Sequence, residues 1–426
     1  MLDPVGTSTD CARGMDGSAQ SFGSSGSGEA ESAYAWVRLT ASLLIGAVGS
    51  VGMWAVVVAL PAVQAEFGVA RADASLPYTL AMLGFGAGAV VIGRLVDRFG
   101  IVLPVIGATL TLGVAFIASG LAPNLMTFAI ANLLIGVGSS ATFAPLIADI
   151  SHWFTKRLGI AVAICASGNY LGGAAWPPIV QRLVEVYGWR INQMIVGVVC
   201  IAAMLPLVLV LRRRLTTHQT AQAAAASGSA SASLGLNPYA LFALLCVAGV
   251  SCCVAMSMPQ VHIVAYCGDL GYGVARGAEM LSLMLGFGII SRIASGFIAD
   301  RIGGVATLLI SAGLQGVALF LYMLFDSLIS LYVISALFGL FQGSIVPMYA
   351  IIVREYFAPQ EAGTRLGMVL MATLGGMALG GWMSGLIFDF TGSYQAAFLN
   401  GLGWNLVNVS IVVWLLLRPG RRLAPA

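Results

Sequence analysis

The chain has 426 residues, of which 59% are hydrophobic and only 9% are charged, and its formal net charge is +3. A soluble protein normally carries about 25% charged residues, so this chain has too little charge to cover a water-facing surface. The composition excludes a soluble globular protein and makes lipid the solvent for most of the chain. The small net charge gives no indication of nucleic-acid binding.

Residues 1–34 are rich in glycine and serine and nearly lack large apolar side chains. Such a composition cannot bury enough surface to fold, so we predict a disordered cytoplasmic tail. The segment lacks a basic stretch followed by an apolar core, and it is therefore not expected to be a cleaved signal peptide.

Beyond the tail, apolar stretches of about 20 or more residues recur, each long enough to cross about 30 Å of hydrocarbon. Turn-forming or charged residues separate them, as at Ala122-Pro123-Asn124. We predict twelve membrane-spanning helices, over residues 37–62, 75–97, 101–122, 125–150, 158–183, 191–211, 238–265, 276–299, 304–325, 328–353, 363–388 and 394–417.

Lysine and arginine collect on one side of these spans. If the N-terminus is cytoplasmic, fifteen of the 20 basic residues lie on the cytoplasmic side, four lie opposite, and Arg292 falls inside a span. Basic loops stay in the cytoplasm in most membrane proteins. We therefore predict a multi-pass protein of a bacterial inner membrane with both termini in the cytoplasm.

The chain repeats itself once. The segment from Gly93 to Gly100 recurs 203 residues later from Gly296 to Gly303, and Pro145 recurs as Pro347. Such constant offsets indicate two duplicated halves of six helices each, with the same topology. We predict bundles over residues 35–211 and 238–417, a cytoplasmic linker over 212–237 and a cytoplasmic tail over 418–426.

Both copies of the repeated segment carry the pattern G-x-x-x-D-R-x-G, directly after the second span of a half. On these two segments the chain resembles the major facilitator superfamily over about residues 37–417. The resemblance implies an all-α integral membrane fold of twelve helices in two parallel six-helix repeats. Two such bundles can rock about a central site, which is the motion that alternating access requires.

The resemblance also implies a latch that holds the cytoplasmic side shut, built from Asp97 and Arg98 in the first half and Asp300 and Arg301 in the second. We expect Asp97 to meet the positive N-terminal end of the span over 363–388, and Arg98 to pair with a carboxylate such as Asp149. The glycines should let neighbouring helices approach closely. Alternatively, the arginines only mark the cytoplasmic face. The family's usual basic residue after the last glycine is replaced by Ile101 and Gly304.

A second set of patterns is similar to the monocarboxylate and oxalate/formate porter branch of this superfamily. It comprises Trp153-Phe154-x-x-Arg157-x-Gly159, Gly168-x-x-x-Gly172-Gly173, Pro259-x-x-His262, Asp269-x-Gly271, Arg292 and Asp389-x-x-Gly392. This similarity implies a transporter of small organic anions.

Arg292 lies eight residues before Asp300, which places it about 12 Å inside the bilayer. A mid-membrane arginine costs roughly 2.5–3.5 kcal/mol, so it must face a cavity or a partner. No aspartate or glutamate occurs inside a span, and the small neighbours Gly288, Ser295 and Gly296 leave room beside the guanidinium. A cation without a built-in counter-ion suits an anionic substrate, and residues 368–382 hold no second cation for a dicarboxylate. The alternative is that Arg292 snorkels toward the cytoplasmic interface.

His262 is the one histidine inside a span, where it could bind substrate, carry a proton or serve as a structural hydrogen-bonding group. Four further side chains lie at central depth and could line a cavity or pack helices together. They are Asn169, Gln342, Phe143 and Trp54.

The sequence contains no phosphate-binding loop and no hydrolase or zinc-protease motif, and its seven cysteines have no metal-ligand spacing. We therefore expect no enzyme, no cofactor and no metal site. The predicted function is secondary active transport of a small organic anion, in particular a monocarboxylate, by a monomer that uses proton coupling or exchange. An exporter of drug-like or other small organic solutes is the alternative, and a sensor or channel is the more remote one.

Overall fold

The computed structural model describes residues 32–154, 157–213, 232–233, 237–357, 359–418 and 421–422. Nearly all of these residues are helical. The exceptions include β1 (Ala232–Ser233) and β2 (Arg421–Arg422), which pair antiparallel over two residues. Most of the predicted tail over 1–34, most of the linker over 212–237 and most of the tail over 418–426 lie outside the described residues.

The helices of the first half are α1 (Ala33–Gly49), α2 (Val51–Phe67), α3 (Arg71–Phe99), α4 (Val102–Gly120), α5 (Leu125–Ser140), α6 (Ala144–Trp153) and α7 (Leu158–Val210). The helices of the second half are α9 (Pro238–Asp269), α10 (Val274–Ile302), α11 (Gly304–Leu324), α12 (Leu328–Gln342), α13 (Ile345–Tyr356), α14 (Pro359–Thr391) and α15 (Tyr394–Leu417).

Within the described residues, eleven helical stretches are long and apolar enough to cross a membrane. The longest of them, Ile160–Val210, is two helices, because Gly188 breaks α7 with φ 79° and ψ 160°. A positive φ is accessible to glycine without a steric penalty. The turn therefore falls between the predicted spans 158–183 and 191–211, and the prediction of twelve spans is confirmed.

Two spans are interrupted at matching places in the two halves. The break between α5 and α6 comes just before Pro145, and the break between α12 and α13 comes just before Pro347. Proline has no N–H, so it leaves the carbonyl four residues earlier without its helical donor. Those carbonyls belong to Ala141 and Gly343, and both are therefore open to other donors.

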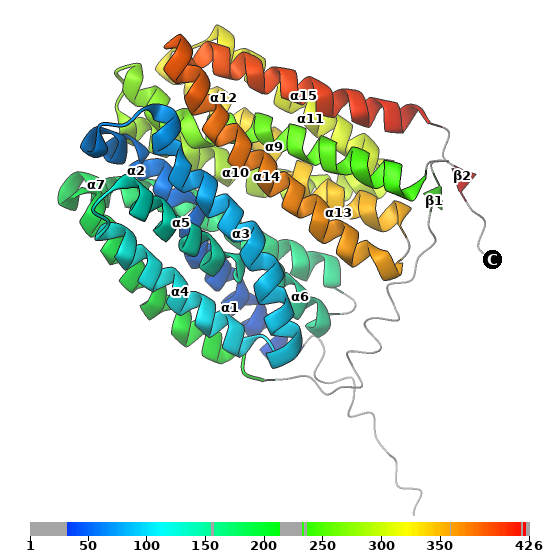
Figure 1. The fold of residues 1–426 in the computed structure, drawn as a ribbon. Helices are drawn as coiled ribbons and strands as arrows, with labels where there is room; N and C mark the ends of the chain where they lie inside the picture. The colour runs from blue at the N-terminus through cyan, green and yellow to red at the C-terminus, as the bar shows by residue number, and fades with distance from the viewer. Residues whose placement is uncertain are drawn as a thin grey trace, which may run out of the picture.

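The two halves lie side by side and meet along two seams (Figure 1). In one seam α3 packs on α14, where Thr79 Oγ1 donates to the Ala378 carbonyl at 3.2 Å. In the other, α7 packs on α10, where the Ser282 hydroxyl donates to the Ala174 carbonyl. We call the end of the bundle that carries Ser32 and Arg418 the terminal face, and the opposite end the far face.

Glycines inside the spans do bring helices together, as the sequence predicts. A Cβ on Gly84 would lie 2.1 Å from the Leu133 carbonyl oxygen, and one on Gly172 would lie 2.0 Å from that of Ala47. The prediction is wrong for Gly93 and Gly296, the first glycines of the repeated segments. No described atom lies within 4 Å of a Cβ at either position, so neither holds a close helix contact in this conformation.

Candidate functional site

Arg292 lies at the seam between the two halves, half-buried on α10. Its Nη1 donates to the Ala166 carbonyl at 3.2 Å, and its guanidinium carbon lies 4.0 Å from the centre of the Tyr170 ring. Both contacts reach α7 of the first half. No ion pair formed among the described residues includes Arg292. The guanidinium is therefore held by neutral groups and not by a carboxylate.

The third contact of Arg292 is a hydrogen bond within its own half. Nε donates at 3.3 Å to the Gly343 carbonyl, which is the carbonyl that Pro347 leaves without a helical donor. A buried carbonyl without a partner is costly, and an arginine N–H can supply one. The repeat-related proline and the arginine within the span thus form one local unit.

Two other predicted residues lie close to this level of the first half. Asn169, adjacent to Tyr170, donates from Nδ2 to Met53 Sδ at 3.6 Å. The Trp54 indole packs against Gly173, whose Cβ would lie 2.8 Å from the Trp54 Nε1, and this N–H is buried without a partner. Phe143 lies at the break before α6 and is half-buried.

His262 lies at a different depth from Arg292, so the structure does not bring all six predicted binding residues into one site. His262 lies seven residues before the end of α9, about 10 Å from the far face, whereas Arg292 lies about 27 Å from the start of α10. The buried His262 donates from Nε2 to the Gly381 carbonyl at 2.8 Å. Gln342 is fully buried and accepts from Gln260 at 2.9 Å inside the second half. His262 is therefore too far from Arg292 along the bundle axis for one small anion to contact both, whereas Gln342 is adjacent to Gly343, whose carbonyl accepts from Arg292.

At the far face, Arg71 of α3 joins the first half to the second. Its Nη1 and Nη2 donate to the two carboxylate oxygens of Asp269 at 3.1 and 3.4 Å, and Nη1 also donates to the Tyr394 hydroxyl. The Asp389 carboxylate accepts from the backbone N–H groups of Arg71 and Ala72 at 2.8 and 2.7 Å. We call Arg71, Asp269, Asp389 and Tyr394 the far-face cluster.

Sequence reasoning did not assign this cluster. Arg71 was only one of the four basic residues opposite the basic side. Asp269-x-Gly271 and Asp389-x-x-Gly392 were noted as patterns of the resembled branch, and they were the one available signal. Asp389 stabilises the start of α3, because a carboxylate both accepts from the first free N–H groups of a helix and meets its positive end.

At the terminal face, no ion pair of the predicted latch forms among the described residues. Asp97, Arg98, Asp300 and Arg301 are all exposed, and none takes part in an ion pair within the described part of the chain. Arg98 lies over the Phe99 ring at 5.3 Å. The prediction that Arg98 pairs with Asp149 is wrong for this conformation, because both oxygens of Asp149 accept from Arg38 at 2.7 Å.

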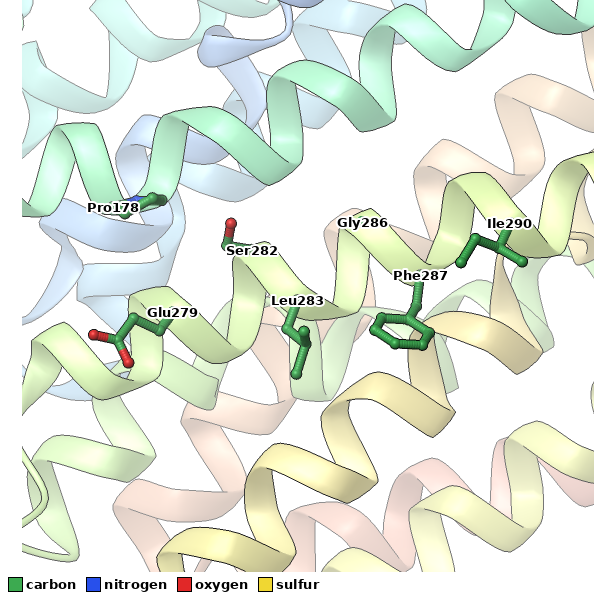
Figure 2. A pocket seen from close by; sticks show the side chains of 7 residues that line it. All are labelled: Pro178, Glu279, Ser282, Leu283, Gly286, Phe287 and Ile290. Atoms are coloured by element: carbon green, nitrogen blue, oxygen red, sulfur yellow. The ribbon is translucent and has the colours of Figure 1, made fainter.

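The larger of the two described pockets does not contain these side chains. It has a volume of about 400 Å³ and is lined by Pro178 of α7 and by one stripe of α10, which consists of Glu279, Ser282, Leu283, Gly286, Phe287 and Ile290. Figure 2 shows Pro178 and Ser282 facing each other, while Leu283, Phe287 and Ile290 point away from α7. The pocket is an open groove on the outside of the seam, where Ile290 is 54% exposed.

Comparison with known proteins decides the family. The family model of the Major Facilitator Superfamily matches residues 42–330 and 280–425. The chain belongs to the major facilitator superfamily. This facilitator is therefore a multi-pass membrane transporter and not an enzyme, and the resemblance stated from its two repeated segments is confirmed.

The relatives of this facilitator include proteins named as monocarboxylate transporters and one named as an efflux protein. Monocarboxylate transporter 13 of Rattus norvegicus is 28% identical over 290 residues, which cover 67% of this chain and 66% of that protein. The agnestins efflux protein AgnL12 of Paecilomyces divaricatus is 27% identical over 282 residues, covering 65% and 63%. The chain thus spans slightly less than two thirds of the length of these relatives.

The fold of the facilitator is also similar to a solved structure. A bacterial homologue of the human lysosomal transporter Spinster, in an inward-facing and occupied conformation, matches with a TM-score of 0.67 and 15% identity. The match covers 90% of this chain and 95% of that one. The likeness shows the shared fold. In the facilitator itself, the far-face cluster joins the halves, while Asp97, Arg98, Asp300 and Arg301 form no ion pair among the described residues.

Arg38 is a buried charge of this facilitator that sequence reasoning assigned only to the basic side. The residue is 2% exposed, pairs with Asp149, donates to the carbonyls of Leu211 and Arg213 at 2.9 and 3.0 Å, and lies over Trp153 at 4.7 Å. It ties the start of α1 to α6 and to the end of α7. Its contacts are confined to the first half, so it stabilises that half and does not latch the two together.

Replacing Arg38 with alanine should therefore destabilise the protein strongly, because it leaves the Asp149 carboxylate without its partner. Loss of one member of a buried ion pair costs about 3–5 kcal/mol. The melting temperature of the detergent-purified variant would measure this. The control is Arg182→Ala. Arg182 pairs with Glu185 and is 76% exposed, so we expect its replacement to lower the free energy of unfolding by only about 0–1 kcal/mol. Equal losses in the two variants would contradict the assignment.

Proposed function

We propose that this facilitator is a secondary active transporter that moves a small organic anion, in particular a monocarboxylate, by alternating access. The observation that carries the proposal is the Arg292 guanidinium, which lies at the seam between the two halves. It contacts carbonyls and an aromatic ring, and no described carboxylate pairs with it. A charge in that position needs an anion, and its planar fork of donors matches a carboxylate.

The charge count favours one carboxylate over two. A dicarboxylate would need a second cation, and residues 368–382 of α14 in the second half contain no lysine, arginine or histidine. The name of the rat relative, Monocarboxylate transporter 13, supports the same substrate class. His262 remains a proposed proton carrier, and both symport with a proton and exchange are compatible with its position.

The bias of basic residues supports an orientation in which the terminal face is cytoplasmic, in a bacterial inner membrane. In that orientation the far-face cluster closes the outside, and Asp97, Arg98, Asp300 and Arg301 are the proposed cytoplasmic gate, unlatched in this conformation. The latch would form when the two halves rock and close the cytoplasmic side.

Uptake into proteoliposomes tests the proposal. Labelled lactate, pyruvate, formate and oxalate are offered separately, with and without a pH gradient, and protein-free liposomes give the background. We expect uptake of at least one monocarboxylate well above background and weaker uptake of oxalate. Stimulation by an inward proton gradient would indicate symport, and stimulation by preloaded substrate would indicate exchange. Background rates for all four anions would contradict the anion assignment.

Export of drug-like or other small organic solutes is the second candidate function, and the likeness to the agnestins efflux protein favours it. Such an exporter would need a wide, apolar cavity and would not depend on a mid-membrane cation. In the same liposomes, transport of neutral aromatic compounds that carboxylates fail to inhibit would support this function over the first.

A further inference from the structure

We propose that the anion site is shared between the two halves, with Tyr170 of the first half as the positioning residue for Arg292 of the second. Tyr170 would set the plane of the guanidinium and thereby the direction from which a carboxylate can approach. The inference rests on the proposed function, since it names how that same site is built.

The first argument is the geometry of the guanidinium. Its carbon lies 4.0 Å from the centre of the Tyr170 ring, a separation at which the cation is attracted by the face of the ring. A contact through the face leaves the edge of the guanidinium free for hydrogen bonds. Arginine has five N–H donors in a fixed fork, and the two hydrogen bonds described use one N–H each on Nε and Nη1.

The second argument is the close packing of the Tyr170 ring against α10. A Cβ on Gly288, one turn from Arg292 on α10, would lie 2.2 Å from Tyr170 Cε1. Only glycine at this position lets the ring lie this close to α10, and Tyr170 is 7% exposed. The room beside Arg292 that the small side chains indicated is therefore filled by an aromatic ring from the other half.

The third argument is the hydrogen bond that holds Nε of Arg292. Nε is held by the Gly343 carbonyl, which is open because of Pro347. With one nitrogen held and one face covered, the edge formed by Nη1 and Nη2 is the part left for an anion. At this edge the competing contact is the 3.2 Å bond to the Ala166 carbonyl.

A carboxylate should displace the Ala166 carbonyl, because it carries a full negative charge and can accept from Nη1 and Nη2 together, whereas the carbonyl is neutral and accepts one hydrogen bond. Occupation would then remove the described hydrogen bond by which Arg292 holds α7, while the ring contact stays and keeps the fork aligned. Binding would remove one of the hydrogen bonds between the halves and leave the Ser282 bond to Ala174 in place, and this links occupancy to their separation.

The test is the transport kinetics of Tyr170 variants with labelled lactate, or with whichever anion of the panel is transported best. Loss of a largely desolvated cation–aromatic contact should raise KM about three- to thirtyfold in Tyr170→Leu and Tyr170→Met. The maximal rate should change less than KM. Tyr170→Phe keeps the ring face and should restore KM to within about twofold. Melting temperatures verify that each variant is folded, and the Met variant serves if Leu fails to fold.

Tyr187→Leu is the matched control, because Tyr187 lies on the same helix, is 54% exposed and does not contact Arg292; its KM should not change. An unchanged KM in Tyr170→Leu or Tyr170→Met, or a Tyr170→Phe variant as impaired as these, would overturn the inference. The proposed function fails separately, if Arg292→Ala retains normal carboxylate uptake.

Discussion

Replacing Arg292 with alanine should reduce carboxylate uptake by about a hundredfold or more while the protein stays folded. The variant removes the mid-membrane cation, and hydrogen bonds to a charged group contribute about 1.5–3 kcal/mol each. Two such bonds to one carboxylate account for a loss of this size. Initial uptake rates in proteoliposomes, normalised to reconstituted protein, measure it directly.

Arg292→Lys separates charge from geometry. Lysine retains the positive charge but offers a single ammonium in place of the planar fork, so we expect uptake that is measurable yet well below that of the parent protein. Arg276→Ala is the control on the same helix, since Arg276 is 53% exposed and pairs with Glu279 near the far face. Full activity in Arg292→Lys would argue against two-point recognition, and full activity in Arg292→Ala would remove the anion assignment.

Breaking the far-face cluster should open that face. Arg71→Ala removes the bonds to Asp269 and Tyr394, and Asp389→Ala removes the cap on the start of α3. Asp269 is 41% exposed, so we expect each substitution to weaken the closed state by about 1–2 kcal/mol. This would raise the population of the open state about five- to thirtyfold.

Thiol labelling reads out this opening. Ser75 is fully buried one helical turn after Arg71 on α3. A Ser75→Cys reporter should therefore react slowly with a membrane-impermeant reagent when the far face is closed. The reaction should accelerate about five- to thirtyfold in Arg71→Ala and Asp389→Ala, relative to the reporter alone. Arg190→Ala is the control, because Arg190 binds Glu66 and carbonyls of its own half. Equal acceleration by Arg190→Ala would show that the cluster does not close the face.

Loss of closure has a consequence for transport. Alternating access requires each face to shut in turn, so a far face that stays open should lower the transport rate more than it changes KM. The exchange rate should fall less than the rate of net uptake if the substrate-bound protein still closes its far face.

Local properties of the sequence were sufficient for the architecture. Hydropathy and turn residues located the spans within a few residues, and the span over 394–417 coincides with α15. The matching positions of Pro145 and Pro347 indicated the two-fold repeat. Arg292 stood out because an arginine inside an apolar stretch is costly wherever the helix packs.

The partners of the charged residues were decided only by the tertiary structure. Asp149 binds Arg38, which lies 111 residues away, and not Arg98, and Arg71 reaches two carboxylates of the other half. Helix rotation, axial offset and the rocking of the two bundles determine which side chains meet, and none of these leaves a periodic signal in the chain. The sequence by itself determined the fold, the repeat and an unpaired cation at depth. The tertiary structure decided that a tyrosine from the opposite half covers this cation, that His262 lies far from it, and that Arg71 joins the two halves at the far face.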